Sequence, residues 1–293
     1  MAIELTNHRG RPLVLALAIT SFYFVVEVIG GILTNSLALL SDAGHMFSDL
    51  SALGLSLFAF QISRRPATMK KTYGFYRFEI LAALVNGLAL WLIVGVILHA
   101  AYQRFYSPPQ VESLGMLVIA AIGLAVNIAT GLILYGSRRE SLNIRGAFLH
   151  VIGDAIASVG AIVAALIMLS TGWYLADPLI SILIAGLILY TSWGVIKESV
   201  DILMQSVPAG ISLSEVQGAM ENVKGVLKVH DLHIWTVTSG VFTLSAHAVV
   251  NGDRDLREVL SETEKALSDK FNIRHTTIQL ETESREAEEF EAF

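Results

Sequence analysis

Residues 36–62 read SLALLSDAGHMFSDLSALGLSLFAFQI, an apolar stretch that contains Asp42, His45 and Asp49. A helix needs about 20 mostly apolar residues to cross the hydrocarbon core of a bilayer, and this stretch is long enough. A charged side chain at that depth costs roughly 2.5–3.5 kcal/mol on insertion scales, so such residues are usually kept for a function. The stretch therefore predicts a transmembrane helix that carries a polar site.

A second apolar stretch, residues 147–170, repeats this polar pattern. It contains His150 and Asp154, with the same His-x-x-x-Asp spacing as His45 and Asp49. Residues four apart lie on one face of a helix. Two such helices side by side would point two imidazoles and two carboxylates at a common centre. That is a complete shell of N and O donors for a tetrahedral divalent metal ion.

An alternative is that each His-Asp pair only forms a hydrogen bond within its own helix. Two matching pairs favour the metal site, because each is flanked by Gly, Ala and Ser residues that permit close helix approach. Two carboxylates also balance a 2+ ion in a low-dielectric setting. Without metal the site should take up protons, which the metal must displace. With access alternating between the two sides of the membrane, this competition predicts proton-coupled exchange.

The composition of the chain excludes an ordinary soluble protein. Of 293 residues, 54% are hydrophobic and only 16% are charged, with a mean hydropathy of +0.60. A globular domain usually carries about 25% charged residues. The chain has no cysteine, which excludes thiolate metal sites and leaves His, Asp and Glu as candidate ligands. The net charge is −6 and no basic face is present, so we expect no nucleic-acid partner.

Six stretches are predicted to be membrane spans. They are Pro12–Leu33, Ser36–Ile62, Phe78–Phe105, Leu114–Tyr135, Ala147–Ser170 and Pro178–Val195. The first apolar run is too long for a cleavable signal peptide, and no small-residue cleavage site follows it. We therefore expect an α-helical membrane protein with six transmembrane helices.

Basic residues gather on one side of this predicted bundle. In the amino terminus and the loops after the second and fourth spans they are Arg9, Arg11, Arg64, Arg65, Lys70, Lys71, Arg138, Arg139 and Arg145. On the other side only Arg104 is basic. Because cytoplasmic loops carry the excess of Lys and Arg, both termini are predicted to be cytoplasmic.

From about residue 206 the pattern becomes that of a small soluble domain. Helices are predicted at Ile211–Val223, with Ser212 or Ser214 as N-cap, and at Asp253–Phe271. Strands are predicted at Val226–Thr238, Val241–Val250 and His275–Glu281, with a hairpin turn at Ser239-Gly240. The order helix–strand–strand–helix–strand predicts a ferredoxin-like α+β domain. We divide the chain into a transmembrane domain (1–205), a small cytoplasmic domain (206–283) and an acidic tail (284–293).

Other polar residues within the spans have more ordinary interpretations. Asp42 could form an outer vestibule, but a helix cap is favoured. Glu27 could relay protons, but an interhelical hydrogen bond is favoured. Arg77 and Glu79, at the start of the third span, are predicted to form a charge cluster that ties the helices to the tail domain.

Several segments resemble the cation diffusion facilitator family over nearly the whole chain. They are NSLALLSDAGHMFSD at 35–49, YGFYRFE at 73–79, the pair His150 and Asp154, and Asp177-Pro178. The resemblance implies a homodimer that exports Zn²⁺ from the cytoplasm in exchange for protons, with the second- and fifth-span pairs binding the ion. His45 resembles the zinc-transporting branch, and imidazole favours Zn²⁺ over Mn²⁺ or Mg²⁺. Cd²⁺ and Co²⁺ accept similar ligands, so selectivity among the three stays open.

The resemblance also implies a second metal site in the tail domain, at His230, His247 and Glu281. A further family ligand, a His two residues before that acid, is Gln279 here, which reduces the expected two-metal cluster to one site. For His233 and His275 a structural role is favoured. The loops lack the His-rich stretch of many eukaryotic zinc carriers, which suggests a bacterial or archaeal carrier, in a bacterium of the inner membrane.

Two other classes of protein were weighed against a carrier. A hydrolytic intramembrane zinc enzyme keeps one coordination position open and needs a base, whereas four protein ligands would close this shell. A metal sensor could instead signal through the tail without transport. Metal flux across a membrane separates the carrier from both.

Overall fold

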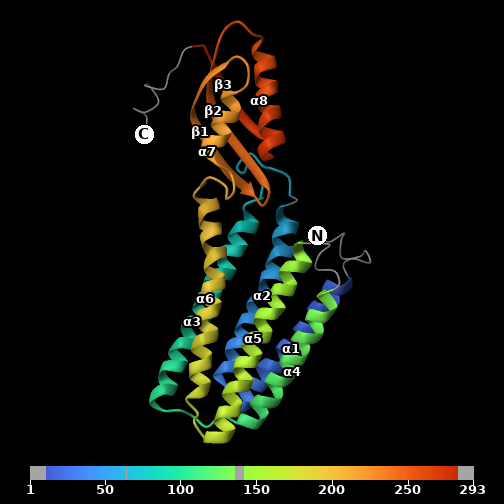
Figure 1. The fold of residues 1–293 in the computed structure, drawn as a ribbon, viewed down its shortest axis with the longest axis vertical. Coiled ribbons are helices and arrows are strands. Elements are labelled where there is room, and N and C mark those ends of the chain that lie inside the picture. Colours follow the sequence, from blue (N-terminus) through green and yellow to red (C-terminus); the bar gives the residue numbers. More distant parts are fainter. Residues whose placement is uncertain (1–10, 64, 136–141, 283–293) are drawn as a thin grey trace. The chain divides into compact units, whose positions relative to one another are not determined.

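The computed structural model describes residues 11–63, 65–135 and 142–282 (Figure 1). The chain divides into two compact units, Met1–Gly54 with Val85–Gly194 and Leu55–Leu84 with Val195–Phe293. Some sequence predictions fall on residues outside the described part, namely on Arg9, Arg64, Arg138, Arg139 and the acidic tail 284–293.

Six long helices make up the first two-thirds of the chain. They are α1 (Arg11–Thr34), α2 (Leu37–Ser63), α3 (Phe78–Tyr106), α4 (Ser113–Tyr135), α5 (Leu142–Thr171) and α6 (Ala176–Leu203). Their bounds lie within two residues of the predicted spans, except that α5 begins five residues earlier and α6 ends eight residues later. The additional turns carry polar side chains such as Arg145, Lys197 and Glu198, so a search for apolar stretches stops short of them.

Within the described residues, five of these helices contain a segment long and apolar enough to cross a membrane. The segments are Leu15–Thr34, Phe78–Tyr106, Ser113–Tyr135, His150–Thr171 and Ala176–Leu203. Helix α2 is of comparable length, with 27 residues. The helix itself is present, and its role as a sixth span stays a prediction.

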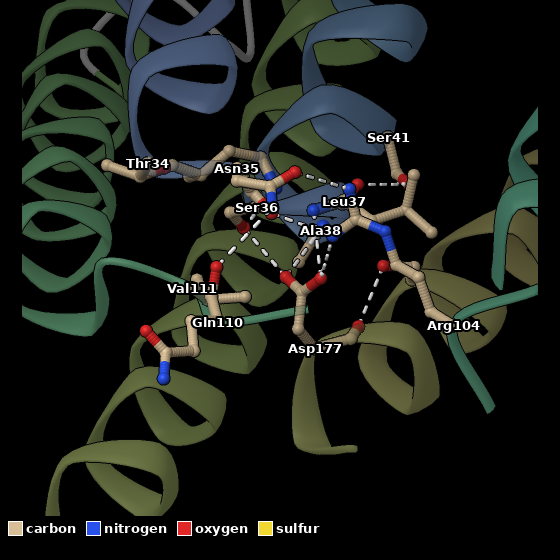
Figure 2. Close-up of polar contacts among 12 residues, drawn as sticks. Thr34, Asn35, Ser36, Leu37, Ala38, Ser41, Arg104, Gln110, Val111 and Asp177 are labelled. Atoms are coloured by element: carbon tan, nitrogen blue, oxygen red, sulfur yellow. Dashed lines mark hydrogen bonds and ion pairs between the residues drawn. The ribbon is translucent and has the colours of Figure 1, made fainter. Parts of the chain in front are cut away.

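The buried carboxylate of Asp177, near the start of α6, holds the start of α2 (Figure 2). It accepts hydrogen bonds from the backbone N–H groups of Leu37 (2.9 Å) and Ala38 (3.1 Å) and from the Ser36 hydroxyl (2.7 Å). Arg104 of α3 donates a fourth bond at 3.0 Å. The first N–H groups of a helix have no partner within the helix, and a carboxylate there also suits the helix dipole. Asp177 therefore fixes where α2 begins.

This contact corrects the interpretation of Asp42. Asp42 was expected to cap the second span, but it lies inside α2, five residues after the first helical residue, and is buried. The N–H groups that a cap would satisfy are bound by Asp177 instead. The prediction of a cap at Asp42 is wrong, because the partner comes from α6, far away in the sequence.

The tail domain has the predicted order of elements. Helix α7 (Leu213–Glu221) is followed by strands β1 (Val226–Thr238) and β2 (Val241–Val250), helix α8 (Leu256–Phe271) and strand β3 (His275–Glu281). The sheet order is β1-β2-β3, with β1 and β2 antiparallel and β2 and β3 parallel. Gly240 adopts a φ of 75° in the hairpin turn, which favours glycine.

The helices of the tail begin at side-chain caps and pack on the sheet. Ser212 caps α7 by accepting from the Glu215 N–H, and Asp255 caps α8 by accepting from the Arg257 N–H. The core beneath them is apolar, and its fully buried members are Val216, Met220, Leu244, Val259, Leu267 and Ile273. Ser212, not Ser214, is thus the N-cap among the two candidates.

Glu79, in the first turn of α3, contacts the hairpin turn of the tail. Its carboxylate accepts hydrogen bonds from Thr238 Oγ1 (2.9 Å) and Ser239 Oγ (3.5 Å). Glu79 thus ties α3 to the tail, as expected, but through hydroxyl groups and not through the charge cluster with Arg77 that the sequence predicted.

Candidate metal centre

Helices α2 and α5 bring the two predicted His-Asp pairs together. The shortest contact crosses between the helices, from His150 Nε2 to Asp49 Oδ2 at 3.0 Å. His45 Nε2 lies 3.9 Å from Asp154 Oδ1, also across the helices. The two imidazole rings face each other with their centroids 5.4 Å apart. All four predicted residues therefore meet at one place.

The geometry does not match a pair of hydrogen bonds within single helices. Within α2, His45 Nε2 and Asp49 Oδ2 are 3.8 Å apart, and within α5, His150 Nε2 and Asp154 Oδ2 are 3.6 Å apart. Both distances exceed those of good hydrogen bonds. The intrahelical alternative thus leaves the 3.0 Å contact between helices unexplained.

The spacing suits a tetrahedral metal ion. Ligand atoms about 2.0–2.1 Å from a tetrahedral Zn²⁺ lie about 3.3–3.4 Å from one another. Four separations among these groups, 3.0, 3.6, 3.8 and 3.9 Å, lie on either side of this value, with Oδ1 of Asp154 facing His45 and its Oδ2 facing His150. Ligand atoms of His45, Asp49 and His150 all lie within 4.8 Å of one another. Small movements of side chains would complete a shell of two nitrogens and two oxygens.

The four groups differ in exposure. The Asp49 and His150 side chains are 40% and 41% exposed, whereas those of His45 and Asp154 are 20% and 8% exposed. One half of the site is therefore open and the other half is enclosed by the helices.

Two more carboxylates lie behind the enclosed half. Glu27 of α1 and Asp42 of α2 are both buried. The hydroxyl of Tyr23 donates to Glu27 Oε1 at 3.2 Å, and it lies equally close to the backbone carbonyl of Ile119 on α4. Tyr23 thus links Glu27 to α4, and Glu27 also lies within hydrogen-bonding reach of Asp42 on α2, as expected for an interhelical contact. The sequence analysis named the buried acid but not the tyrosine, although the two lie four residues apart on one face of α1.

The three residues expected in the tail also meet. His230 on β1 and His247 on β2 are directly opposed in the sheet. Glu281, at the end of β3, reaches both: its Oε2 lies 3.1 Å from His230 Nε2 and its Oε1 lies 3.1 Å from His247 Nδ1. These ligand atoms lie within 4.8 Å of one another, and His230 and Glu281 are buried. Two imidazoles and one carboxylate could hold one metal ion.

The neighbouring residues have structural contacts. The Gln279 side-chain amide donates to Glu281 Oε1 at 2.8 Å, so it orients the carboxylate where the family pattern has a further ligand. His233 pairs with Asp231 at 2.9 Å on the exposed side of β1. The His275 ring lies edge-on to Tyr73, with 6.0 Å between centroids. None of these three residues belongs to the trio.

Comparisons with known proteins identify the family. The cation efflux transmembrane domain matches residues 13–204, and the cytoplasmic domain of cation efflux proteins matches residues 208–283. The chain belongs to the cation efflux family. The resemblance seen in the sequence is thereby confirmed, and this cation efflux protein is a multi-pass membrane transporter and not an enzyme.

Similar proteins cover almost the whole chain. It is 46% identical over 285 residues to the cadmium, cobalt and zinc/H(+)-K(+) antiporter of Bacillus velezensis, which covers 94% of this chain and 91% of the relative. Identity is 45% to the metal cation efflux system protein CzcD of Cupriavidus metallidurans and 42% to the zinc transporter ZitB of Escherichia coli, each over 94% of this chain and 88% of the relative. A solved structure, the metal-bound C-terminal domain of the CzcD transporter from Cupriavidus metallidurans, is 43% identical and matches 24% of this chain and 99% of its own, with a TM-score of 0.24.

Proposed function

We propose that this cation efflux protein exports Zn²⁺ from the cytoplasm in exchange for protons, by alternating access to a site formed by His45, Asp49, His150 and Asp154. The observation that carries the proposal is the 3.0 Å contact between Asp49 and His150, which joins the two His-Asp pairs across α2 and α5. The names of similar proteins, which mention zinc, cadmium, cobalt and H(+), support the cargo and the counter-ion. Cd²⁺ and Co²⁺ are further cargo candidates, because they accept the same N and O ligands.

Protons enter the cycle through the ligands themselves. The two carboxylates neutralise a bound 2+ ion, so the loaded site carries little net charge inside the membrane. When the ion leaves, the carboxylates and imidazoles bind protons, and the next metal ion must displace them. A site that holds either metal or protons, but not both, couples the two flows in opposite directions.

The exposure of the site favours access from the cytoplasmic side. With cytoplasmic termini, the end of α2 and the start of α5 face the cytoplasm, so Asp49 and His150 form the inner half of the site. These two side chains are 40% and 41% exposed, while Asp154 is 8% exposed. In this arrangement cytoplasmic metal can enter, and export requires the helices to close this half and open the other.

The tail provides dimerisation and a regulatory metal site. Residues 206–283 assemble two copies of the chain in the inner membrane of a bacterial cell, with residues 1–205 crossing the bilayer and 284–293 as an acidic tail. His230, His247 and Glu281 hold one resident Zn²⁺. Both termini lie in the cytoplasm, so this site senses the same pool of metal that is exported.

Flux through reconstituted protein tests the transport site. Proteoliposomes with a pH gradient should take up Zn²⁺, and the Asp49→Ala, Asp154→Ala double variant should lose this uptake. The matched control, Asp253→Ala with Asp269→Ala, removes two exposed carboxylates of the tail and should transport like the wild type. Wild-type flux in the first double variant would contradict the site assignment. Zn²⁺ binding without any flux in the wild type would instead favour a sensor.

A further inference from the structure

A basic hollow lies where the loop between α2 and α3 meets strand β1. Its volume is about 300 Å³. Three cations line it, Lys70, Lys71 and Arg77, and Tyr73 and Trp235 add aromatic rings. All of these residues belong to one compact unit of the chain. The transport site does not include them.

No acid of the described residues neutralises the positive charge of this hollow. Within residues 11–63, 65–135 and 142–282, no carboxylate forms an ion pair with Lys70, Lys71 or Arg77, and none lines the hollow. The nearest acid along the chain is Glu79, whose carboxylate is occupied by the hydroxyls of Thr238 and Ser239. Arg77 therefore does not form the charge cluster with Glu79 that the sequence suggested. Its guanidinium is left for another anion.

The loop holds the cations in a defined place. Thr68 and Lys71 exchange two backbone hydrogen bonds, of 3.1 and 3.0 Å, and the Gly74 N–H donates to the Lys71 carbonyl at 2.8 Å. Gly74 has a φ of 71°, a conformation that favours glycine. The Lys71 ammonium also lies 4.4 Å from the centre of the Phe75 ring. A loop fixed in this way has less conformational entropy to lose when a ligand binds.

We propose that this hollow binds a phosphate group, presented by an anionic phospholipid or as a free phosphate. Lys and Arg donate charge-assisted hydrogen bonds to phosphate oxygens. The loop joins the ends of two long helices, and basic pockets at such ends bind the head groups of anionic lipids. A volume of about 300 Å³ lies at the lower limit of ligand pockets and suits a head group. The tyrosine and tryptophan rings suit the interface between lipid and water.

Binding of short-chain lipids to the purified full-length protein tests this proposal. Dihexanoyl phosphatidylglycerol, dihexanoyl phosphatidylcholine and inorganic phosphate are titrated separately in an uncharged detergent, below the micelle concentration of each lipid. Binding is followed by the change in tryptophan fluorescence. The part of this change that is absent in the Trp235→Phe variant reports binding in the hollow. Lys70→Gln with Lys71→Gln removes two cations of the hollow. The matched control, Lys265→Gln with Lys270→Gln, removes two exposed cations of α8.

Phosphatidylglycerol should bind the wild type, and its Kd should rise about 30-fold in the variant of the hollow, at roughly fivefold for each cation. The α8 control should stay within twofold. If inorganic phosphate binds as tightly as phosphatidylglycerol and depends on Lys70 and Lys71 in the same way, free phosphate is the ligand. Equal binding of phosphatidylcholine, equal losses in both double variants, or no binding of either anion would overturn the proposal. Wild-type melting temperatures of the variants exclude misfolding as the cause of a loss.

Discussion

At the scale of single residues, the two candidate metal centres differ in how far their ligands are enclosed. The His230 and Glu281 side chains in the tail are 3% and 5% exposed, whereas Asp49 and His150 between α2 and α5 are 40% and 41% exposed. A buried carboxylate between two imidazoles suits an ion that stays, since ligand movement is restricted on all sides. A half-open site suits an ion that enters and leaves.

This contrast predicts two bound zinc ions per chain, with different exchange rates. Glu281→Gln removes the carboxylate that reaches both tail histidines, so it should lower the metal content of the purified protein from two Zn²⁺ to one. His247→Gln should have the same effect. The control, His233→Gln, changes an exposed histidine of the same strand pair and should leave two bound Zn²⁺ per chain. Metal analysis after equilibrium dialysis against buffer that contains a known concentration of free Zn²⁺ measures this. An unchanged content in both Glu281→Gln and His247→Gln would rule out the tail site.

The sequence predicted the members of both centres, but for different reasons. The pairs His45 with Asp49 and His150 with Asp154 are local, because a spacing of four places two residues on one helix face. The contact of His150 with Asp49 depends on the packing of α2 against α5 and has no local signal. The tail trio was predicted only from family resemblance, since its members lie on three strands of one sheet.

At the scale of elements, the start of α2 depends on a carboxylate from another helix. The hydrogen bonds that Asp177 accepts from Ser36, Leu37 and Ala38 join residues 139–141 positions apart. No periodicity or capping motif near residue 36 reveals such a partner, which is why the sequence assigned the cap to Asp42. Helix bounds were predicted better, because apolar stretches report them directly. The predicted bounds were wrong mainly at the end of α6, where the helix continues with polar residues beyond its apolar part.

Removing the Asp177 charge should therefore destabilise the protein strongly. Asp177→Asn leaves Arg104 without its carboxylate and keeps at most part of the cap on α2. Breaking a buried ion pair costs about 3–5 kcal/mol, and we expect the lower end, about 3 kcal/mol, because Arg104 is partly exposed. Thermal unfolding in detergent measures the loss. Asp201→Asn, an exposed acid on the same helix, is the matched control and should unfold like the wild type.

At the scale of the whole molecule, the direction of transport depends on which way the chain lies in the membrane. Lys and Arg favour the cytoplasmic side. Among the described residues, Arg65, Lys70 and Lys71 follow α2, whereas Arg104 lies near the end of α3 and is tied to Asp177. The orientation therefore depends on the same loop that forms the phosphate pocket.

Labelling of single cysteines tests this orientation, and the absence of native cysteine removes background. Ser107→Cys lies after α3 and Ser206→Cys lies after α6, and both positions are exposed. With cytoplasmic termini, a membrane-impermeant maleimide should label Ser107→Cys only in right-side-out vesicles and Ser206→Cys only in inverted ones. The opposite pattern would place Asp49 and His150 on the outer side, so that the open half of the site would collect metal from outside. Export would then require the enclosed half to face the cytoplasm, and the proposed direction of the proton exchange would be reversed.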